Sequence, residues 1–181
     1  MQKITIVTGN AGKLRELEAM AGGQLDFAMQ KLELVEIQSL DLEEIVKDKL
    51  ERAFAQIKTP VIVDDVAAGL DDLEGLPGPF IKFFNDKLGG DSLYQLAGKK
   101  EAPVSVRCIA AYYDGKTMLF GDGRLKGTVV APRGTNGFGF DICIAPEGET
   151  RTMAEMTEQE KMQISHRGRA FRSLLQQLKD L

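Results

Sequence analysis

The sequence predicts an α/β protein: one elongated mixed β-sheet with two α/β lobes on either side of a cleft. In the first third, short β-branched runs alternate with amphipathic helical segments, which is the pattern of α/β units. Two longer apolar runs then meet at Asp114-Gly115, a strong β-hairpin signal. Because this antiparallel section separates two α/β halves, we expect a single domain, residues 1–181, built as two lobes.

Size and charge narrow the class of protein. With 181 residues, 43% hydrophobic and 28% charged, the chain can bury a core of its own. Its net charge of −4 gives no electrostatic reason to expect a nucleic-acid partner. We find no apolar run of about 18 residues, so we predict no membrane span and a cytoplasmic protein. Cys108 and Cys143 lie in apolar contexts typical of buried free thiols.

The first strand, residues 3–7 (KITIV), leads through Thr8-Gly-Asn-Ala-Gly-Lys13 into a helix that ends near Gly22-Gly23. A strand, a glycine-containing turn and a helix start can hold phosphate through backbone N–H groups. Thr8 and Asn10 add side-chain donors and Lys13 adds a charge, although the spacing is not that of a Walker A loop. A simple helix-start turn is the alternative.

A second strand is expected at residues 25–29, and Leu34-Val-Glu36 leads to a helix over residues 42–57. Asp41 and Glu44 have the spacing of a capping box. Lys49 falls inside the apolar stripe of that helix. Such a lysine either extends to the solvent at the edge of the stripe or reaches an anion site.

A buried strand is expected over residues 60–63, followed at once by Asp64 and Asp65. Neighbouring residues on a strand face opposite sides, so the two carboxylates cannot act as one clamp. We therefore expect one acid to face a site and the other to support it. Ligands of open sheets collect outside the carboxyl ends of strands. A solvated acidic turn is the alternative.

The middle of the chain continues with a rigid turn, Gly75-Leu-Pro-Gly-Pro79, and a helix that carries Lys82 beside aromatic residues. A short helix is expected at residues 91–96. Strands are expected at residues 104–113, 117–124, 127–130 and 139–144, with a loop at 131–137.

The last part of the chain is predicted to be helical. Thr157 and Glu160 form a second capping-box pattern, and Ser165 is placed to cap the final helix. His166, the single histidine, stands between Ser165 and Arg167. A surface or capping role is the alternative for this histidine. One histidine with two isolated cysteines excludes a zinc site, and no nucleophile elbow supports a triad.

Several of these stretches together resemble the inosine triphosphate pyrophosphatase family. They are Thr8-Gly-Asn-Ala-Gly-Lys13, Val63-Asp-Asp65, Gly75-Leu-Pro-Gly-Pro-Phe-Ile-Lys82, Ala131-Pro-Arg-Gly134, Phe138-Gly-Phe-Asp141, residues 152–161 and Ser165-His-Arg167. They span almost the whole chain in the family's order. The resemblance implies a nucleotide-binding cleft between the lobes and a homodimer. It also implies Mg²⁺-dependent hydrolysis of ITP, dITP and XTP to the monophosphate and pyrophosphate.

The resemblance also implies roles for particular residues. Phosphate contacts are implied for Thr8, Gly9, Asn10, Lys13, Lys49 and Lys82. Glu36 and Asp65 match the acids that hold Mg²⁺ and that position or deprotonate the attacking water, and Asp64 is expected to support them. Catalytic roles are thus implied for Asp65, Glu36 and Lys13.

The same resemblance implies a purine pocket formed by Phe138, Gly139, Phe140, Asp141, Lys161, Ser165, His166 and Arg167. Phe140 matches the ring that stacks on the purine, and Phe138 is expected to form pocket wall. Donors at the purine edge would donate hydrogen bonds to the C6 oxygen of hypoxanthine or xanthine and would find no acceptor in the amino group of adenine.

One departure from the family pattern bears on activity. Val66-Ala67-Ala68 follows the two acids where a small hydroxyl or cysteine is usual. A hydroxyl that supports the acid or a phosphate is thereby lost. The alternative interpretation is therefore a nucleotide-binding module of the same fold with weak or no hydrolysis.

Overall fold

A computed structural model describes residues 3–180 of the chain. The chain divides into two compact units: unit 1 contains residues 1–65, 108–123 and 167–181, and unit 2 contains residues 66–107 and 124–166. The elements, in order, are β1 Ile4–Val7, α1 Ala11–Ala21, β2 Phe27–Gln30, α2 Leu42–Ile57, β3 Val61–Leu70, η1 Asp71–Leu73, β4 Pro77–Gly78, α3 Ile81–Leu88, α4 Ser92–Leu96, β5 Ala102–Tyr113, β6 Met118–Val129, η2 Gly139–Cys143, β7 Ile144–Pro146, η3 Met153–Glu155, α5 Glu158–Ile164 and α6 His166–Lys179.

Within the described residues, seven strands form one mixed sheet in the order β2-β1-β3-β5-β6-β7, with β4 paired to β3. The first strands are parallel, with Ile4 opposite Phe27 and Thr5 opposite Val61. The later ones are antiparallel, as in the pairing of Thr128 with Ala145. The predicted mixed α/β sheet is confirmed, and β3, β5 and β6 each contribute residues to both units.

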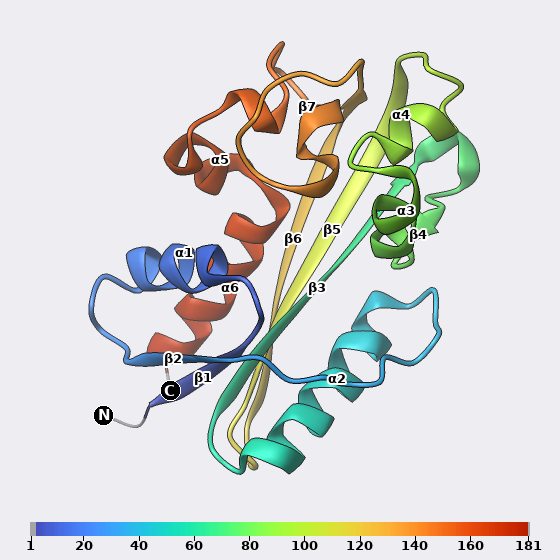
Figure 1. Cartoon of the computed structure of the whole chain (residues 1–181). Helices are drawn as coiled ribbons and strands as arrows, with labels where there is room; N and C mark the ends of the chain where they lie inside the picture. Colours follow the sequence, from blue (N-terminus) through green and yellow to red (C-terminus); the bar gives the residue numbers. More distant parts are fainter. Residues whose placement is uncertain (1–2, 181) are drawn as a thin grey trace. The chain divides into compact units, whose positions relative to one another are not determined.

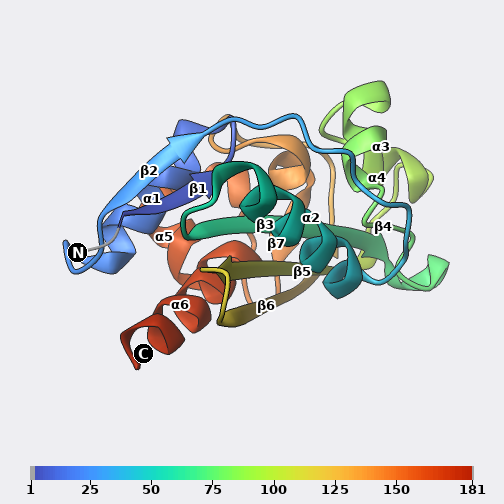
Figure 2. The ribbon, with the colours of Figure 1, turned by 90° about the horizontal axis from the view of Figure 1, so that it is seen from below.

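In unit 1, helices cover the parallel strands from both sides. α2 and α6 flank the strands (Figure 1), and α1 lies beside β1 and β2 (Figure 2). The buried core of this unit includes Leu17, Leu50, Ile62 and Phe171. α1 starts at its N-cap Asn10, whose side chain accepts a hydrogen bond from the Gly12 N–H at 2.8 Å. It ends at Gly22, which has the left-handed conformation expected of a C-cap.

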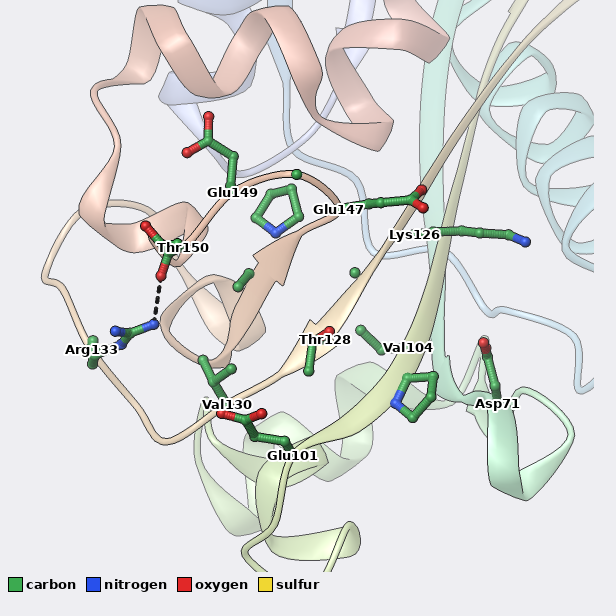
Figure 3. Close-up of a pocket in the computed structure, with 15 residues that line it drawn as sticks. Asp71, Glu101, Val104, Lys126, Thr128, Val130, Arg133, Glu147, Glu149 and Thr150 are labelled. Carbon is green, nitrogen blue, oxygen red and sulfur yellow. Dashed lines mark hydrogen bonds between the residues drawn. The ribbon is translucent and has the colours of Figure 1, made fainter.

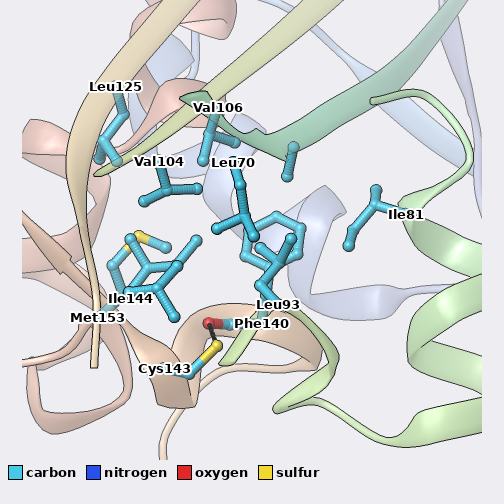
Figure 4. Packing of buried hydrophobic residues seen from close by; sticks show 12 residues of the cluster. Leu70, Ile81, Leu93, Val104, Val106, Leu125, Phe140, Cys143, Ile144 and Met153 are labelled. Atoms are coloured by element: carbon cyan, nitrogen blue, oxygen red, sulfur yellow. Dashed lines mark hydrogen bonds between the residues drawn. The ribbon is translucent and has the colours of Figure 1, made fainter. Parts of the chain in front are cut away.

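Unit 2 is built around a separate group of buried side chains, shown in Figure 4. They come from the strands β3, β5, β6 and β7 and from α3, α4, η2 and η3. The cluster consists of Ala68, Leu70, Ile81, Leu93, Val104, Val106, Leu125, Val129, Phe140, Cys143, Ile144 and Met153. Burial raises the pKa of the Cys143 thiol to about 12, so this cysteine is a packing residue.

Three expected strand boundaries were wrong. β3 does not stop before the acids but runs on to Leu70, so Asp64 and Asp65 are mid-strand residues. Residues 117–124 and 127–130 belong to one continuous strand, β6, since Lys126 and Gly127 keep the strand alternation. Residues 139–143 form a 3₁₀ turn instead of a strand, because the Asp141 carboxylate accepts a hydrogen bond from the Phe138 N–H at 3.2 Å.

The predicted helix starts are largely correct. Asp41 caps α2 through the Glu43 N–H, but Glu44 accepts from the Ser39 hydroxyl at 2.7 Å instead of completing a capping box. The Thr157–Glu160 capping box of α5 is confirmed. Among the described residues, none of the helices is both long enough and apolar enough to cross a membrane.

Gly69 explains the turn that follows β3. The turn folds back so that β4 pairs with β3, with Gly69 opposite Pro77. A Cβ at Gly69 would run into the carbonyl group of Gly75. Only glycine therefore allows the Gly75–Pro79 turn to lie directly on the strand.

We predict that Gly69→Ala lowers the free energy of unfolding by about 2 kcal/mol or more, because backbone atoms must move to admit the methyl group. Urea unfolding followed by circular dichroism measures this. Gly9→Ala is the control, since its nearest neighbour is the flexible side chain of Lys31 at 3.5 Å. Equal stability of the two variants would show that the turn does not depend on the missing side chain.

Candidate functional site

The predicted residues of unit 1 gather into two ion-pair networks, and the first is centred on Asp64. The Lys13 ammonium donates to both carboxylate oxygens of Asp64, at 2.8 and 2.9 Å. Arg167 donates through Nε to the second of these oxygens at 3.3 Å. The Asp64 side chain is only 1% exposed, so this carboxylate is held almost entirely by protein groups.

The local structure brings these three side chains together. Ile6 of β1 lies opposite Ile62 of β3, so β1 ends at Val7, just before the strand position that Asp64 takes on β3. The chain then turns through Thr8, whose hydroxyl oxygen accepts a hydrogen bond from the Asn10 N–H at 3.1 Å. Lys13 follows in the first turns of α1.

The pKa of Asp64 shows which effect dominates in this network. Burial by itself would raise the pKa of a carboxyl, because it disfavours the charged form. The charges of Lys13 and Arg167 outweigh burial and hold the pKa of Asp64 well below its ordinary value. Asp64 is therefore ionised throughout the physiological range, and it is a fixed anchor for two cations.

The second network is centred on Lys49 of α2. Its ammonium donates to Glu36 Oε1 at 2.9 Å and to Asp65 Oδ2 at 3.0 Å. The Lys49 side chain is 17% exposed, so the ammonium ends at the two acids and not in open solvent. Burial acts to lower the pKa of Lys49, but Asp65 and Glu36 raise it above its ordinary value.

The two networks have opposite net charge. Asp64, Lys13 and Arg167 are one anion and two cations, whereas Lys49, Glu36 and Asp65 are one cation and two anions. Each lysine uses two of its three N–H donors in its network, which leaves one donor for a further acceptor. Unit 1 therefore holds a cation-rich group around Asp64 and an anion-rich group that includes Asp65, the next residue of β3.

The donor set of the second network fits Mg²⁺. Mg²⁺ in nucleotide sites takes one or two carboxylates and completes its octahedron with water and phosphate oxygens. Glu36 and Asp65 already aim one carboxylate oxygen each at a common cation. Among residues 3–180, no group of three or more histidine, cysteine or acidic side chains has metal-binding geometry, so these two carboxylates would be the protein's whole contribution to a metal here.

In unit 2, Asp141 and Lys161 form a buried ion pair, with 3.0 Å between Lys161 Nζ and Asp141 Oδ2. The same ammonium lies 5.5 Å from the ring centre of Phe138. Gly137 is required here, because a Cβ at this position would meet the Asp141 carboxylate and lie 2.9 Å from Lys161 Nζ. The loop and α5 are thus fixed to each other around Asp141 and Gly137.

Phe140 and His166 form the second contact among the predicted residues of unit 2. Their ring centres are 5.9 Å apart at an interplanar angle of 43°. Phe140 is 8% exposed and belongs to the core cluster, whereas Phe138 is 47% exposed. Ser165, also buried, precedes α6 directly and is the C-cap of α5.

Lys82 stands apart from these groups. It is exposed in the first turn of α3 and forms no ion pair with the other residues that the structure describes. Unit 2 also contains a hollow of about 590 Å³, shown in Figure 3. Its lining comes mainly from β5, β6, β7 and the residues next to them, and it includes Lys126, Arg133 and Glu147. Of these three, the sequence indicated only Arg133, through the Ala131-Pro-Arg-Gly134 stretch.

Sequence reasoning missed the pairing of Arg167 with Asp64. The resemblance assigned Arg167 to the purine edge, and Asp64 was expected only to support its neighbour. No local pattern links two residues 103 positions apart. The one available signal was charge: a buried strand acid needs cations nearby.

We compared the chain with known protein families. The family model described as the Ham1 family matches residues 4–177, which include both networks of unit 1 and the paired residues of unit 2. The chain belongs to the Ham1 family.

Named relatives agree with this membership. The inosine triphosphate pyrophosphatase of Emericella nidulans is 40% identical over 99% of this chain and 98% of its own length. The structure of a Ham1 protein from Coxiella burnetii covers both chains completely, with a TM-score of 0.84 and 26% identity. A dITP/XTP pyrophosphatase structure from Mycobacterium abscessus has a TM-score of 0.70 and 26% identity, over 92% of this chain and 95% of its own.

We predict that Asp64→Asn destabilises this Ham1 protein by roughly 3 kcal/mol at pH 7, because it leaves two buried cations without their anion. Since the folded pKa of Asp64 is depressed, its contribution is present above about pH 4 and lost as pH falls below that value. Urea unfolding at pH 7 and at pH 3 measures the difference.

The exposed Asp26→Asn change in the same unit is the control and is expected to stay within about 0.5 kcal/mol of the wild type. A gap between wild type and Asp64→Asn that stays constant from pH 7 to pH 3 would contradict the ion-pair explanation.

Proposed function

We propose that this protein hydrolyses the non-standard purine nucleoside triphosphates ITP, dITP and XTP to the monophosphate and pyrophosphate. The observation that carries the proposal is the pair of networks in unit 1, which offers cations for phosphate and carboxylates for a metal on adjacent residues. The names of the relatives, an inosine triphosphate pyrophosphatase and a dITP/XTP pyrophosphatase, support the same substrates.

The phosphates are assigned to Lys13, Lys49 and Lys82 together with the turn from Thr8 through Gly9 to Asn10. A triphosphate carries about four negative charges, so several fixed cations are needed around it. Lys13 and Lys49 each keep one N–H donor beyond their carboxylate partners, and that donor is available to a phosphate oxygen.

Mg²⁺ is the metal we propose, held by Glu36 and Asp65. When bound, Mg²⁺ neutralises charge on the phosphates and lowers the pKa of a coordinated water. Asp65 is assigned as a metal ligand or as the general base that takes the proton of the attacking water. Asp64 positions Lys13 and Arg167 and does not take part in the proton transfer.

The purine is assigned to Phe138, Gly139, Phe140, Asp141, Lys161, Ser165, His166 and Arg167. Hypoxanthine and xanthine present an acceptor oxygen at C6, and Arg167 and a His166 N–H supply donors. Adenine presents an amino donor there, and an unpaired buried donor costs about 1–3 kcal/mol, enough for roughly 10- to 100-fold discrimination.

A second candidate function rests on Val66-Ala67-Ala68. Without a hydroxyl next to Asp65, the chain would bind the same nucleotides and turn them over slowly or not at all.

The proposal also includes a single domain over residues 1–181, a homodimer and a cytoplasmic location, with no nucleic-acid or membrane partner.

We predict that, with Mg²⁺, the protein releases pyrophosphate from ITP, dITP and XTP at least about tenfold faster than from ATP, as one unmatched donor at C6 requires. Pyrophosphate release from a panel of these nucleotides and GTP is the assay. Asp65→Asn is expected to abolish release while the protein stays folded.

Equal release from ATP would contradict the purine assignment. ITP binding by calorimetry without turnover would favour the binding module.

We predict that Phe140→Leu raises KM for ITP about tenfold with a smaller effect on kcat, because base stacking contributes about 1–3 kcal/mol. Leucine keeps most of the buried volume in the core cluster. Phe138→Leu is the matched variant, and as pocket wall it should change KM less than about threefold on the same scale. The reverse order would identify the more exposed Phe138 as the stacking ring.

A further inference from the structure

Lys49 lies between the two carboxylates that we propose as metal ligands. Its ammonium lies 2.9 Å from Glu36 Oε1 and 3.0 Å from Asp65 Oδ2, the same two residues that we propose as metal ligands. The lysine therefore stands where a divalent cation would have to approach both oxygens. Two cations cannot share that position without strong repulsion at short range.

We infer that Lys49 is the resident counter-ion of the Glu36–Asp65 pair and makes divalent-cation binding at that pair depend on a phosphate anion. The inference rests on the proposed function, which supplies both the metal and the phosphate. It adds a positioning role for Lys49, since the lysine acts on the metal through the two carboxylates.

The surroundings of Lys49 favour an exchange of partners over a fixed ion pair. Lys49 comes from α2, Asp65 from β3 and Glu36 from the segment before α2. Of the three side chains, lysine has the longest flexible stem, so its ammonium can change partners while the backbone stays in place. A phosphate group gives that ammonium new acceptors. The carboxylate oxygens are then released to a metal that arrives with the anion.

The neighbouring network makes this exchange specific to Lys49. Asp64 binds Lys13 through both oxygens and is 1% exposed, so Lys13 is held in place. Glu36 is exposed, and Asp65 is partly exposed, so the Lys49 network is open to solvent ions. Of the two lysines, Lys49 is the one whose partners a metal can reach.

The test is Mn²⁺ binding without nucleotide, measured from the electron paramagnetic resonance signal of free Mn²⁺. After subtraction of the Mn²⁺ that pyrophosphate binds in a titration without protein, wild type should bind Mn²⁺ alone weakly and at least about tenfold more tightly with pyrophosphate, since removing one close charge interaction is worth at least that factor. Lys49→Met should bind Mn²⁺ alone at least about tenfold more tightly than wild type, for the same reason. Pyrophosphate should improve the affinity of this variant much less.

Lys47→Met is the matched control, because it removes one exposed positive charge from the same helix and should leave Mn²⁺ affinity unchanged. The double variant Lys49→Met/Asp65→Asn should lose the gain, which locates the ion at the carboxylates. If Lys49→Met does not fold, Lys49→Gln, which removes the same charge and keeps a polar side chain beside the two carboxylates, is measured in the same way.

Mn²⁺ affinity that does not change with Lys49→Met, or wild-type affinity that does not change with pyrophosphate, would overturn the inference. Pyrophosphate release from ITP by the wild type would then show that the proposed function stands without it. Absence of that release would count against the proposed function itself.

Discussion

The alternation of side chains at Asp64 and Asp65 is the constraint on which the candidate site depends. On β3 the two carboxylates face opposite sides of the strand, so each gathers different partners. Asp64 collects Lys13 and Arg167, and Asp65 shares Lys49 with Glu36. A single strand register thereby separates a cation-rich group from an anion-rich group. A one-residue shift of β3 would exchange the two faces and destroy both networks.

Burial makes the Asp64 network rigid as well as charged. A buried carboxylate is costly unless cations and hydrogen bonds offset its lost hydration, and Asp64 is satisfied by two cations at once. Moving Lys13 or Arg167 away would leave the buried Asp64 charge less compensated, and this free-energy cost keeps both side chains in place. In unit 2 the buried Asp141–Lys161 pair has the same effect on the loop that carries Phe138. Both units thus use buried ion pairs to fix groups that the proposed chemistry needs in one geometry.

The sequence predicted the pieces of the site better than their pairing. Strand alternation predicted that Asp64 and Asp65 would not act as one clamp, and the two acids do have different ion-pair partners. The apolar stripe of α2 marked Lys49 as unusual before any partner was known. The strand end after Val63 was wrong, because β1 ends beside that residue while β3, which also neighbours β5 in the sheet, continues to Leu70. Residues 139–144 were predicted as a strand, since a hydrogen bond from the Phe138 N–H to the Asp141 carboxylate closes a turn without leaving a periodic pattern in the sequence. The Asp64–Arg167 contact joins distant segments, and only the fold shows it.

Binding of pyrophosphate with Mg²⁺, followed by calorimetry on wild type and Lys13→Met, tests most directly whether the cation-rich side of β3 receives phosphate. Lys13 offers one N–H donor beyond Asp64, and a charged hydrogen bond of that kind is worth about 1.5–3 kcal/mol. The account predicts binding weakened at least about tenfold in Lys13→Met and unchanged in Lys47→Met. Pyrophosphate binding of equal strength in wild type and Lys13→Met would contradict it.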